Sequence, residues 1–285
     1  MESPPDDNER LTLDSDSAAD FDPDVSPQSD GGGAEQPTPV ARFGAGKAIA
    51  SFLLLLISQV LVGIAVIVLT LIVAVVRGEN IADEQVMGRL LQDTQAVTLL
   101  AASIASVLVV YLIARLWAWP LVLDRSANGI GFRPAPYRYV AAAAGVGVVL
   151  GVCYLSVVQW LVPFDPTTPI GPLAAAAKTG GATRLAWAVL ALIIAPVVEE
   201  FFFRGLLLKG FVTTWGVAAG SAAATILFIS LHLLETFAYW PATVAITVMA
   251  LVTLGARVVT GSLVPAIAAH IGYNAIIVAA VYAAS

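Results

Sequence analysis

Long apolar runs are the feature that most limits what this chain can fold into. Six or seven segments rich in Leu, Val, Ile and Ala approach or exceed the roughly 20 residues that a helix needs to cross hydrocarbon. Of the 285 residues, 59% are apolar and 12% are charged, against about 45–50% and 25% in a soluble domain. We therefore predict an all-α, polytopic transmembrane helical bundle of about seven helices, within a range of six to eight. The runs predict helices near residues 48–76, 95–119, 139–162, 185–208, 216–234, 240–257 and 264–283.

The first 45 residues have a different composition, rich in Asp, Ser, Pro and Gly. Residues 1–40 hold 11 of the 20 acidic side chains and a single base, Arg10. Such a segment cannot bury enough apolar surface to offset its chain entropy. We expect a disordered acidic tail over residues 1–45 and a transmembrane domain over residues 46–285, with the lipid bilayer as its partner. An acidic, aromatic-poor segment does not suit nucleic acid, so nucleic-acid partners are excluded.

The basic residues that flank the predicted helices give an orientation. Cytoplasmic loops of membrane proteins carry an excess of Lys and Arg. A cytoplasmic amino terminus places eight such residues inside and four outside, and we therefore expect a multi-pass protein of the cell membrane with its amino terminus in the cytoplasm. The inside set is Arg42, Lys47, Arg115, Arg125, Arg133, Arg138, Lys209 and Arg257, and the outside set is Arg77, Arg89, Lys178 and Arg184.

Cys153 is the only cysteine of the chain, and it lies inside an apolar run. A single cysteine can build neither a disulfide framework nor a thiolate metal cluster within one chain. We expect it to be a small core residue.

Three charged residues, Glu199, Glu200 and Arg204, stand in an otherwise apolar helix. Each central charge costs about 2.5–3.5 kcal/mol in hydrocarbon, so some compensation must exist. Glu200 and Arg204 are four residues apart and share a helix face, where a carboxylate and a guanidinium can pair. Glu199 is rotated away by about 100°. An unpaired intramembrane carboxylate is a candidate general base, although a packing network of the three charges is the alternative.

Both histidines of the chain, His232 and His270, also lie in apolar runs. The four-residue spacing puts Phe228 on the face of His232 and Asn274 on the face of His270. Either histidine alone is typical of a hydrogen-bonded residue between helices. Both histidines, the adjacent glutamates and an asparagine on three membrane helices most simply meet at one polar centre.

The three patterns, taken in order, resemble the signature motifs of the CAAX protease and bacteriocin-processing family of intramembrane proteases, also called Abi. The resemblance covers about residues 185–280, and the run 260–270 is similar to the segment before that family's last motif. The motifs are Glu199-Glu200-x-x-x-Arg204, Phe228-x-x-x-His232 and His270-x-x-x-Asn274.

The resemblance implies an intramembrane endopeptidase that acts on a peptide or protein substrate, which can itself be membrane-associated. Glu199, with His232, would activate a water for attack on a peptide carbonyl. His270 and Asn274 would steady the oxyanion. A cavity of low dielectric constant strengthens such oxyanion donors.

The remaining roles concern orientation and metal. By the same resemblance, Glu200 and Arg204 would orient the site. From the residues themselves, Glu199, His232 and His270 can form a catalytic site of the His₂Glu type for a divalent metal such as Zn²⁺, with water in the open position. The same atoms can also work without metal, and the sequence does not choose between the two.

Two other classes of function stay open at this stage. Intramembrane Glu, His and Arg also carry protons or bind substrate in transporters and proton relays. A catalytically silent peptide-binding or immunity protein would use the same polar centre as a dock.

Overall fold

The computed structural model of the chain describes residues 43–161, 181–236 and 239–283. All of them belong to one unit of the chain, Arg42–Ser285. Nearly all of the expected acidic tail therefore lies outside the described residues. Within the described ranges the secondary structure is helical and contains no strand, which confirms the predicted all-α class.

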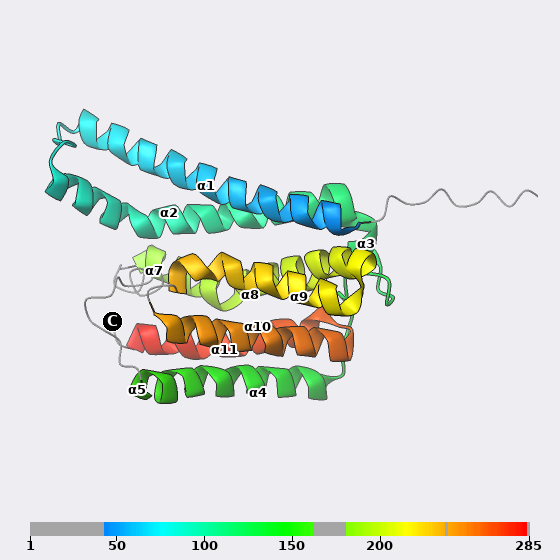
Figure 1. Ribbon diagram of the computed structural model, residues 1–285. Helices are drawn as coiled ribbons and strands as arrows, with labels where there is room; N and C mark the ends of the chain where they lie inside the picture. Colours follow the sequence, from blue (N-terminus) through cyan, green and yellow to red (C-terminus); the bar gives the residue numbers. More distant parts are fainter. Residues whose placement is uncertain (1–42, 162–180, 237–238, 284–285) are drawn as a thin grey trace, which may run out of the picture. The chain divides into compact units, whose positions relative to one another are not determined.

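Figure 1 shows how the described helices are arranged, and π-helical turns, named η here, adjoin several of them. They are α1 (Ala45–Val76), α2 (Glu84–Ile113), η1 (Ala114–Ala118), α3 (Trp119–Leu123), α4 (Tyr137–Cys153), η2 (Tyr154–Val158), α5 (Gln159–Leu161), α7 (Gly181–Val189), η3 (Leu190–Ile194), α8 (Ala195–Glu200), η4 (Phe201–Leu207), α9 (Leu208–Thr236), α10 (Trp240–Thr260) and α11 (Leu263–Ala283).

Six helical stretches of the described chain are long and apolar enough to cross a membrane. This number lies within the predicted range of six to eight. The protein is therefore an integral membrane protein. The stretches are Ala45–Val76, Glu84–Leu123, Tyr137–Val157, Arg184–Leu233, Trp240–Thr260 and Leu263–Ala283.

The fourth stretch, Arg184–Leu233, is 50 residues long and reverses direction within α9. Gly216 has φ 79° and ψ 174°, which is not helical. A Cβ placed on Gly220 would lie 2.6 Å from the backbone nitrogen of Val212, although residues eight apart in a straight helix are separated by about 12 Å. The stretch therefore contains two antiparallel segments, in agreement with the separate helices predicted at 185–208 and 216–234.

The second helix begins at Glu84, well before the predicted start at residue 95. Its first turns are polar, so the apolar run does not mark them. Asp83 caps the helix, because its Oδ1 accepts hydrogen bonds from the backbone nitrogens of Gln85 at 2.8 Å and Val86 at 3.4 Å.

Close packing of α4 against α11 fixes the helix that carries His270 and Asn274. A Cβ on Gly147 of α4 would lie 1.9 Å from the Ala269 carbonyl oxygen, and one on Gly272 of α11 would lie 2.5 Å from the Ala144 carbonyl oxygen. Glycine lets the two backbones approach, as small residues do between membrane helices. Cys153, at the end of α4, is exposed, so the expectation that it is a core residue was wrong.

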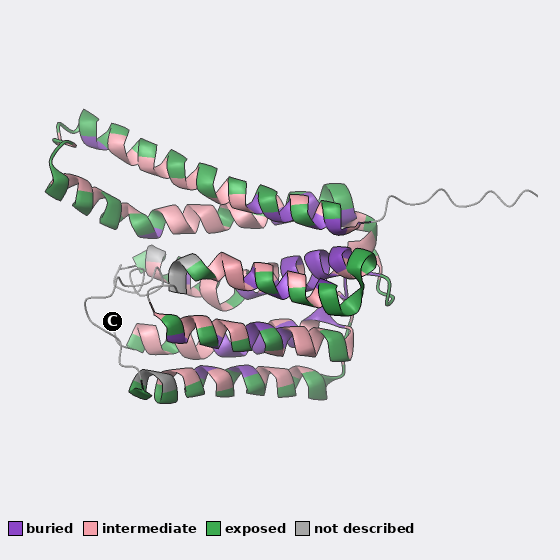
Figure 2. Ribbon diagram, in the orientation of Figure 1, coloured by how far each residue is buried: buried purple, intermediate pink, exposed green. Residues whose placement is uncertain are grey.

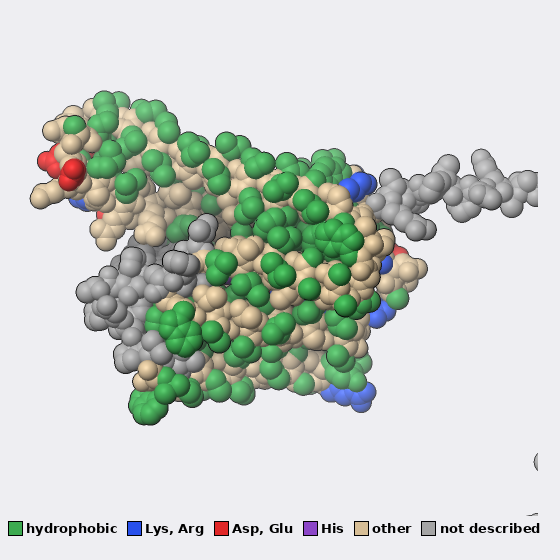
Figure 3. Space-filling model, viewed as in Figure 1, with side chains coloured by type: hydrophobic (Ala, Val, Ile, Leu, Met, Phe, Trp, Pro, Cys, Tyr) green, Lys and Arg blue, Asp and Glu red, His purple; other side chains and the backbone are tan. Residues whose placement is uncertain are grey.

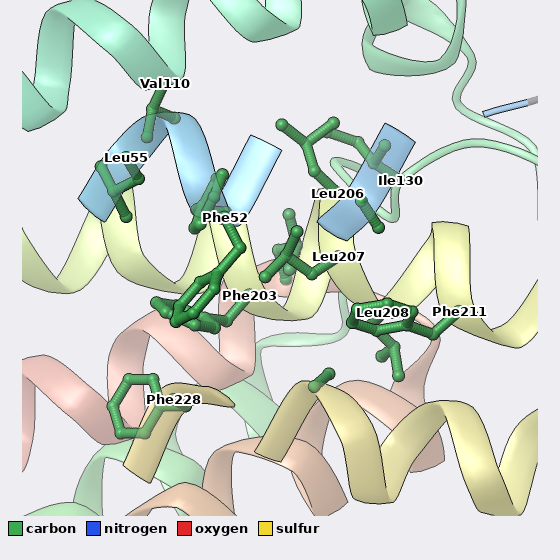
Figure 4. Close-up of a cluster of buried hydrophobic side chains, with 14 of the residues drawn as sticks. Phe52, Leu55, Val110, Ile130, Phe203, Leu206, Leu207, Leu208, Phe211 and Phe228 are labelled. Carbon is green, nitrogen blue, oxygen red and sulfur yellow. The ribbon is translucent and has the colours of Figure 1, made fainter. Parts of the chain in front are cut away.

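Figure 4 shows the cluster of buried apolar side chains that joins η4 to α1 and α2. Phe203, Leu206 and Leu207 of η4 are at most 1% exposed, and Phe52 and Leu55 of α1 pack in the same cluster. Buried positions gather where the start of α1 meets η4 and α9, whereas the far ends of α1 and α2 are mostly exposed (Figure 2). The π-helical turn that follows the glutamates is thus packed against α1 and α2.

The outer surface is apolar along the length of the helices. On the face shown in Figure 3, hydrophobic side chains cover the middle, and charged side chains gather at the two ends. Leu61 and Leu69 of α1 are 60% and 61% exposed. Such a surface requires lipid as its solvent.

Candidate active site

Three helical segments carry the six predicted site residues, and side-chain contacts of 3.9 Å or less join five of them, all except Asn274. Glu199 and Glu200 end α8, and Arg204 follows them in the π-helical turn η4. His232 lies near the end of α9, and both remaining residues lie on α11, where His270 is 3% exposed.

Glu199 stands between the two histidines. Its Oε2 lies 3.8 Å from Nε2 of His232 and 3.9 Å from Nε2 of His270. These separations are too long for direct hydrogen bonds but suit one bridging water. A Glu199 oxygen thus lies within single-water reach of a His232 nitrogen. The same Oε2 is buried and has no hydrogen-bond partner among the described residues.

The hydrogen bonds of the two imidazoles fix which nitrogen carries a proton. Nδ1 of His232 lies 3.0 Å from the Phe228 carbonyl oxygen, and Nδ1 of His270 lies 2.9 Å from Oε1 of Glu200. A carbonyl or carboxylate oxygen only accepts, so each Nδ1 donates. In the neutral rings, both Nε2 atoms therefore direct lone pairs toward Glu199. Three acceptors face one another, which is an arrangement that calls for a proton donor between them.

Glu200 forms the buried ion pair that the spacing predicts. Its Oε2 lies 3.4 Å from Nε of Arg204, and both side chains are at most 2% exposed. The guanidinium also donates from Nη2 to the Ala250 carbonyl oxygen at 3.0 Å and lies over the Phe228 ring, with Cζ 4.0 Å from the ring centroid. The pair, the carbonyl of α10 and the ring together compensate the buried positive charge.

Asn274 supports the helix that carries the glutamates. Its Nδ2 donates to the Ala191 carbonyl oxygen at 2.7 Å. In the π-helical turn η3, the Ala195 nitrogen donates to the Leu190 carbonyl oxygen, so the next donor in that register, to Ala191, would be residue 196. This residue is Pro196, which has no N–H. Asn274 therefore satisfies a carbonyl that the proline leaves open, and the motif spacing gave no sign of this contact.

A cavity of about 90 Å³ adjoins Glu199. Of the six predicted residues, Glu199 alone lines it. The other polar lining residues are Gln59 of α1 and Ser103 and Ser106 of α2. The sequence carried a signal for Gln59, because a carboxamide in the middle of an apolar run calls for a partner.

The separations at Glu199 are wide for a bound metal. Ligand distances of about 2.0–2.2 Å in tetrahedral geometry would bring the donor atoms to about 3.3–3.6 Å from one another, whereas they lie 3.8 and 3.9 Å apart. Among the described residues, no group of three His, Cys, Asp or Glu side chains is placed to hold a metal ion. Metal dependence therefore stays an expectation from the sequence, with Glu199, His232 and His270 as the residues that would hold the ion.

Comparison with known proteins shows what this region is similar to. Residues 181–276 match the family model described as type II CAAX prenyl endopeptidase Rce1-like. Comparison with curated proteins and with solved structures gave no match. The matched segment contains all six predicted site residues. Residues 181–276 are thus an Rce1-like segment, and the resemblance to the CAAX protease and bacteriocin-processing family is confirmed over this part of the chain.

Proposed function

We propose that this protein is an intramembrane endopeptidase of the CAAX type, which hydrolyses a peptide bond with a water activated by Glu199 and His232. The observation that supports this most directly is the position of the Glu199 carboxylate, 3.8 and 3.9 Å from two imidazole nitrogens. The substrate is a peptide segment that reaches the site within the membrane.

The first step is attack by water. A water between Glu199 and His232 donates one hydrogen bond to Oε2 of Glu199 and one to Nε2 of His232, whose Nδ1 proton is held by Phe228. As its oxygen bonds to the scissile carbonyl carbon, its proton passes to Glu199. Glu199 then gives that proton to the leaving nitrogen, the C–N bond breaks, and a carboxylic acid and an amine result.

The negative oxygen of the tetrahedral intermediate needs hydrogen-bond donors. His270 can donate from Nε2 only when both of its nitrogens are protonated, because Nδ1 already donates to Glu200. The Glu200 carboxylate balances this imidazolium. Before attack, Arg204 and the His270 imidazolium balance the Glu199 and Glu200 carboxylates. After the proton passes to Glu199, the oxyanion carries the second negative charge, so the net charge of the cluster stays zero.

Glu200 and Arg204 position the site and do not touch the substrate. Glu200 holds the His270 ring by its Oε1, and Arg204 holds Glu200 by the ion pair. Asn274 keeps one amide hydrogen beyond its bond to Ala191, and this hydrogen is available to the oxyanion.

The test is cleavage of a peptide library by the purified protein in lipid nanodiscs. Glu199→Gln and His232→Ala should abolish turnover, because they remove the groups that activate water. Glu79→Gln, in an exposed ion pair with Arg89, is the matched control and should cleave like wild type. Cleavage by Glu199→Gln at the wild-type rate would contradict the proposal.

Two further outcomes separate the alternatives. Ion-coupled flux without cleavage would favour a transporter or proton relay, and peptide binding without cleavage would favour a silent dock. Loss of turnover in 1,10-phenanthroline, restored by Zn²⁺, would replace the metal-free mechanism with a metal-assisted one.

A further inference from the structure

A polar pair joins α1 to α2 inside the membrane-spanning part of the chain. Gln59 lies in the middle of the apolar helix α1, and its Nε2 donates to Oγ of Ser106 on α2 at 3.0 Å. The Ser106 hydroxyl in turn donates to the Ala102 carbonyl oxygen at 2.8 Å. A carboxamide at this depth is costly unless it has polar partners.

This pair lines the same cavity as Glu199. The cavity volume of about 90 Å³ is well above the roughly 10–15 Å³ that one water requires. The space therefore accepts several waters or part of a peptide. Apolar side chains such as Val107 and Phe202 form much of the remaining lining.

Gln59 keeps unused hydrogen-bonding capacity on this cavity. In the described part of the chain its side chain makes one hydrogen bond, through one amide hydrogen. The second amide hydrogen and the two lone pairs of Oε1 remain. One donor beside one acceptor is the complement of one residue in an extended backbone, whose own N–H and C=O point to the same side.

A substrate in the membrane needs such a partner. Hydrolysis requires an extended backbone at the scissile bond, and an extended backbone in hydrocarbon has unsatisfied N–H and C=O groups. Gln59 can satisfy the N–H and C=O of one such residue on the cavity that Glu199 also lines.

We propose that Gln59, held by Ser106, binds the backbone N–H and C=O of one residue in an extended, apolar substrate segment and thereby places the scissile bond beside Glu199. This inference rests on the proposed hydrolytic function. Gln59 is thus a substrate-binding residue that lies outside the Rce1-like segment, residues 181–276.

The competing explanation is that the Gln59–Ser106 bond only joins two helices, as polar residues do in membranes. The two explanations differ for Ser106→Ala. This change removes the interhelical bond but leaves the carboxamide on the cavity. A purely structural bond predicts equal effects of Ser106→Ala and Gln59→Leu, whereas substrate binding predicts a larger effect of Gln59→Leu.

The kinetic test measures KM and kcat on a peptide that the wild type cleaves. Gln59→Leu should raise KM by about threefold to tenfold, as expected for the loss of one net hydrogen bond, with kcat changed less. Ser106→Ala should change KM less than Gln59→Leu does. Ser58→Ala is the control, because the Ser58 hydroxyl bonds within α1, to Leu55, and does not line the cavity.

A binding test keeps the inference independent of turnover. A fluorescein-labelled peptide of alternating valine and leucine is added to Glu199→Gln protein in nanodiscs, with and without Gln59→Leu. In a matched series of peptides, one backbone amide at a time is replaced by an ester, which removes one N–H. At one position the ester should weaken binding to the protein that keeps Gln59 and have no effect on the Gln59→Leu protein.

The outcomes separate this inference from the proposed function. Unchanged KM and unchanged peptide affinity in Gln59→Leu would overturn the role of Gln59, even if Glu199→Gln is inactive. Equal losses in Ser106→Ala and Gln59→Leu, matched by equal losses of thermal stability, would overturn it as well. Absence of cleavage by the wild type, with ester-sensitive binding that requires Gln59, would refute the hydrolytic function and retain the binding site.

Discussion

Glu200 has no exposure to solvent, yet it is in contact with two groups that favour its charged form. Arg204 lies on one side of the carboxylate and His270 on the other. Burial of a lone charge would be strongly unfavourable. Loss of Arg204 or His270 would therefore leave the charge of Glu200 with too little compensation for its burial. Arg204, Glu200 and His270 thus form a chain of three interacting side chains. The neighbouring Glu199 takes no part in the ion pair.

A double-mutant cycle tests this pair. Glu200→Gln keeps an acceptor for His270 and removes the charge, and Arg204→Met removes the guanidinium. Each single change should lower the free energy of unfolding by about 3–5 kcal/mol, because it leaves one buried charge unpaired. The double variant should lose less than the sum of the two, as measured by thermal unfolding in detergent.

The exposed pair of Arg89 with Glu79, at 2.7 Å, provides the comparison. Its coupling should be no more than about 1 kcal/mol, because water screens it. Additive losses for Glu200→Gln and Arg204→Met would show that the buried pair does not stabilise the fold.

At the scale of helices, the segment η3–α8 is the element that places Glu199. The π-helical turn η3 precedes Pro196, and such turns are often found at functional sites. The carbonyl left open at Ala191 is bound by Asn274 of α11. Asn274 thus ties the glutamate-bearing helix to the histidine-bearing helix.

Asn274→Leu should lower the free energy of unfolding by about 1–3 kcal/mol, because it leaves the Ala191 carbonyl without a partner. Pro196→Ala restores an N–H that can bond to that carbonyl, so Asn274→Leu should cost less in the Pro196→Ala protein. Thermal unfolding of the four proteins measures this difference.

Turnover of the same four proteins separates the structural role of Asn274 from a role at the oxyanion. Loss of an oxyanion donor reduces kcat by about 10²–10³. If Asn274 also donates to the oxyanion, Pro196→Ala should restore stability but not kcat. Recovery of both would leave Asn274 with the structural role alone.

At the scale of the whole transmembrane unit, basic residues gather at the end where α1 begins. Arg257 of α10 donates from Nη2 to the Ile130 carbonyl oxygen, and Arg133 donates from Nε to the Gly261 carbonyl oxygen. These contacts put the loop before α4, the end of α10 and the start of α11 at one end of the helices. By the positive-inside rule, we propose that this end faces the cytoplasm.

Thiol labelling tests the orientation in a Cys153→Ala protein. Asn128→Cys lies in the exposed loop at the basic end, and Ala82→Cys lies in the exposed connection between α1 and α2. A membrane-impermeant maleimide should label Ala82→Cys in intact cells and Asn128→Cys only after lysis. The reverse pattern would invert the proposed orientation, and labelling of both in intact cells would contradict the arrangement of the helices.

The positions of the helices and one buried ion pair could be predicted from the sequence alone. Apolar length is a property of each segment by itself, so the predicted runs agree with the observed helices except where polar turns extend them, as at the start of α2. The pairing of Glu200 with Arg204 was also predictable, because a four-residue spacing brings two side chains together within one helix.

Only the tertiary structure decided which helix faces met. Glu199 lies between histidines from two other helices, Asn274 reaches a carbonyl that Pro196 leaves open, and Gln59 pairs with a residue 47 positions away. Such contacts depend on how helices rotate and pack, which is set by small residues such as Gly147 and Gly272 where backbones meet. In an apolar solvent almost any face of a hydrophobic helix can point toward lipid. For this reason the sequence did not indicate that Cys153 is exposed and not in the core.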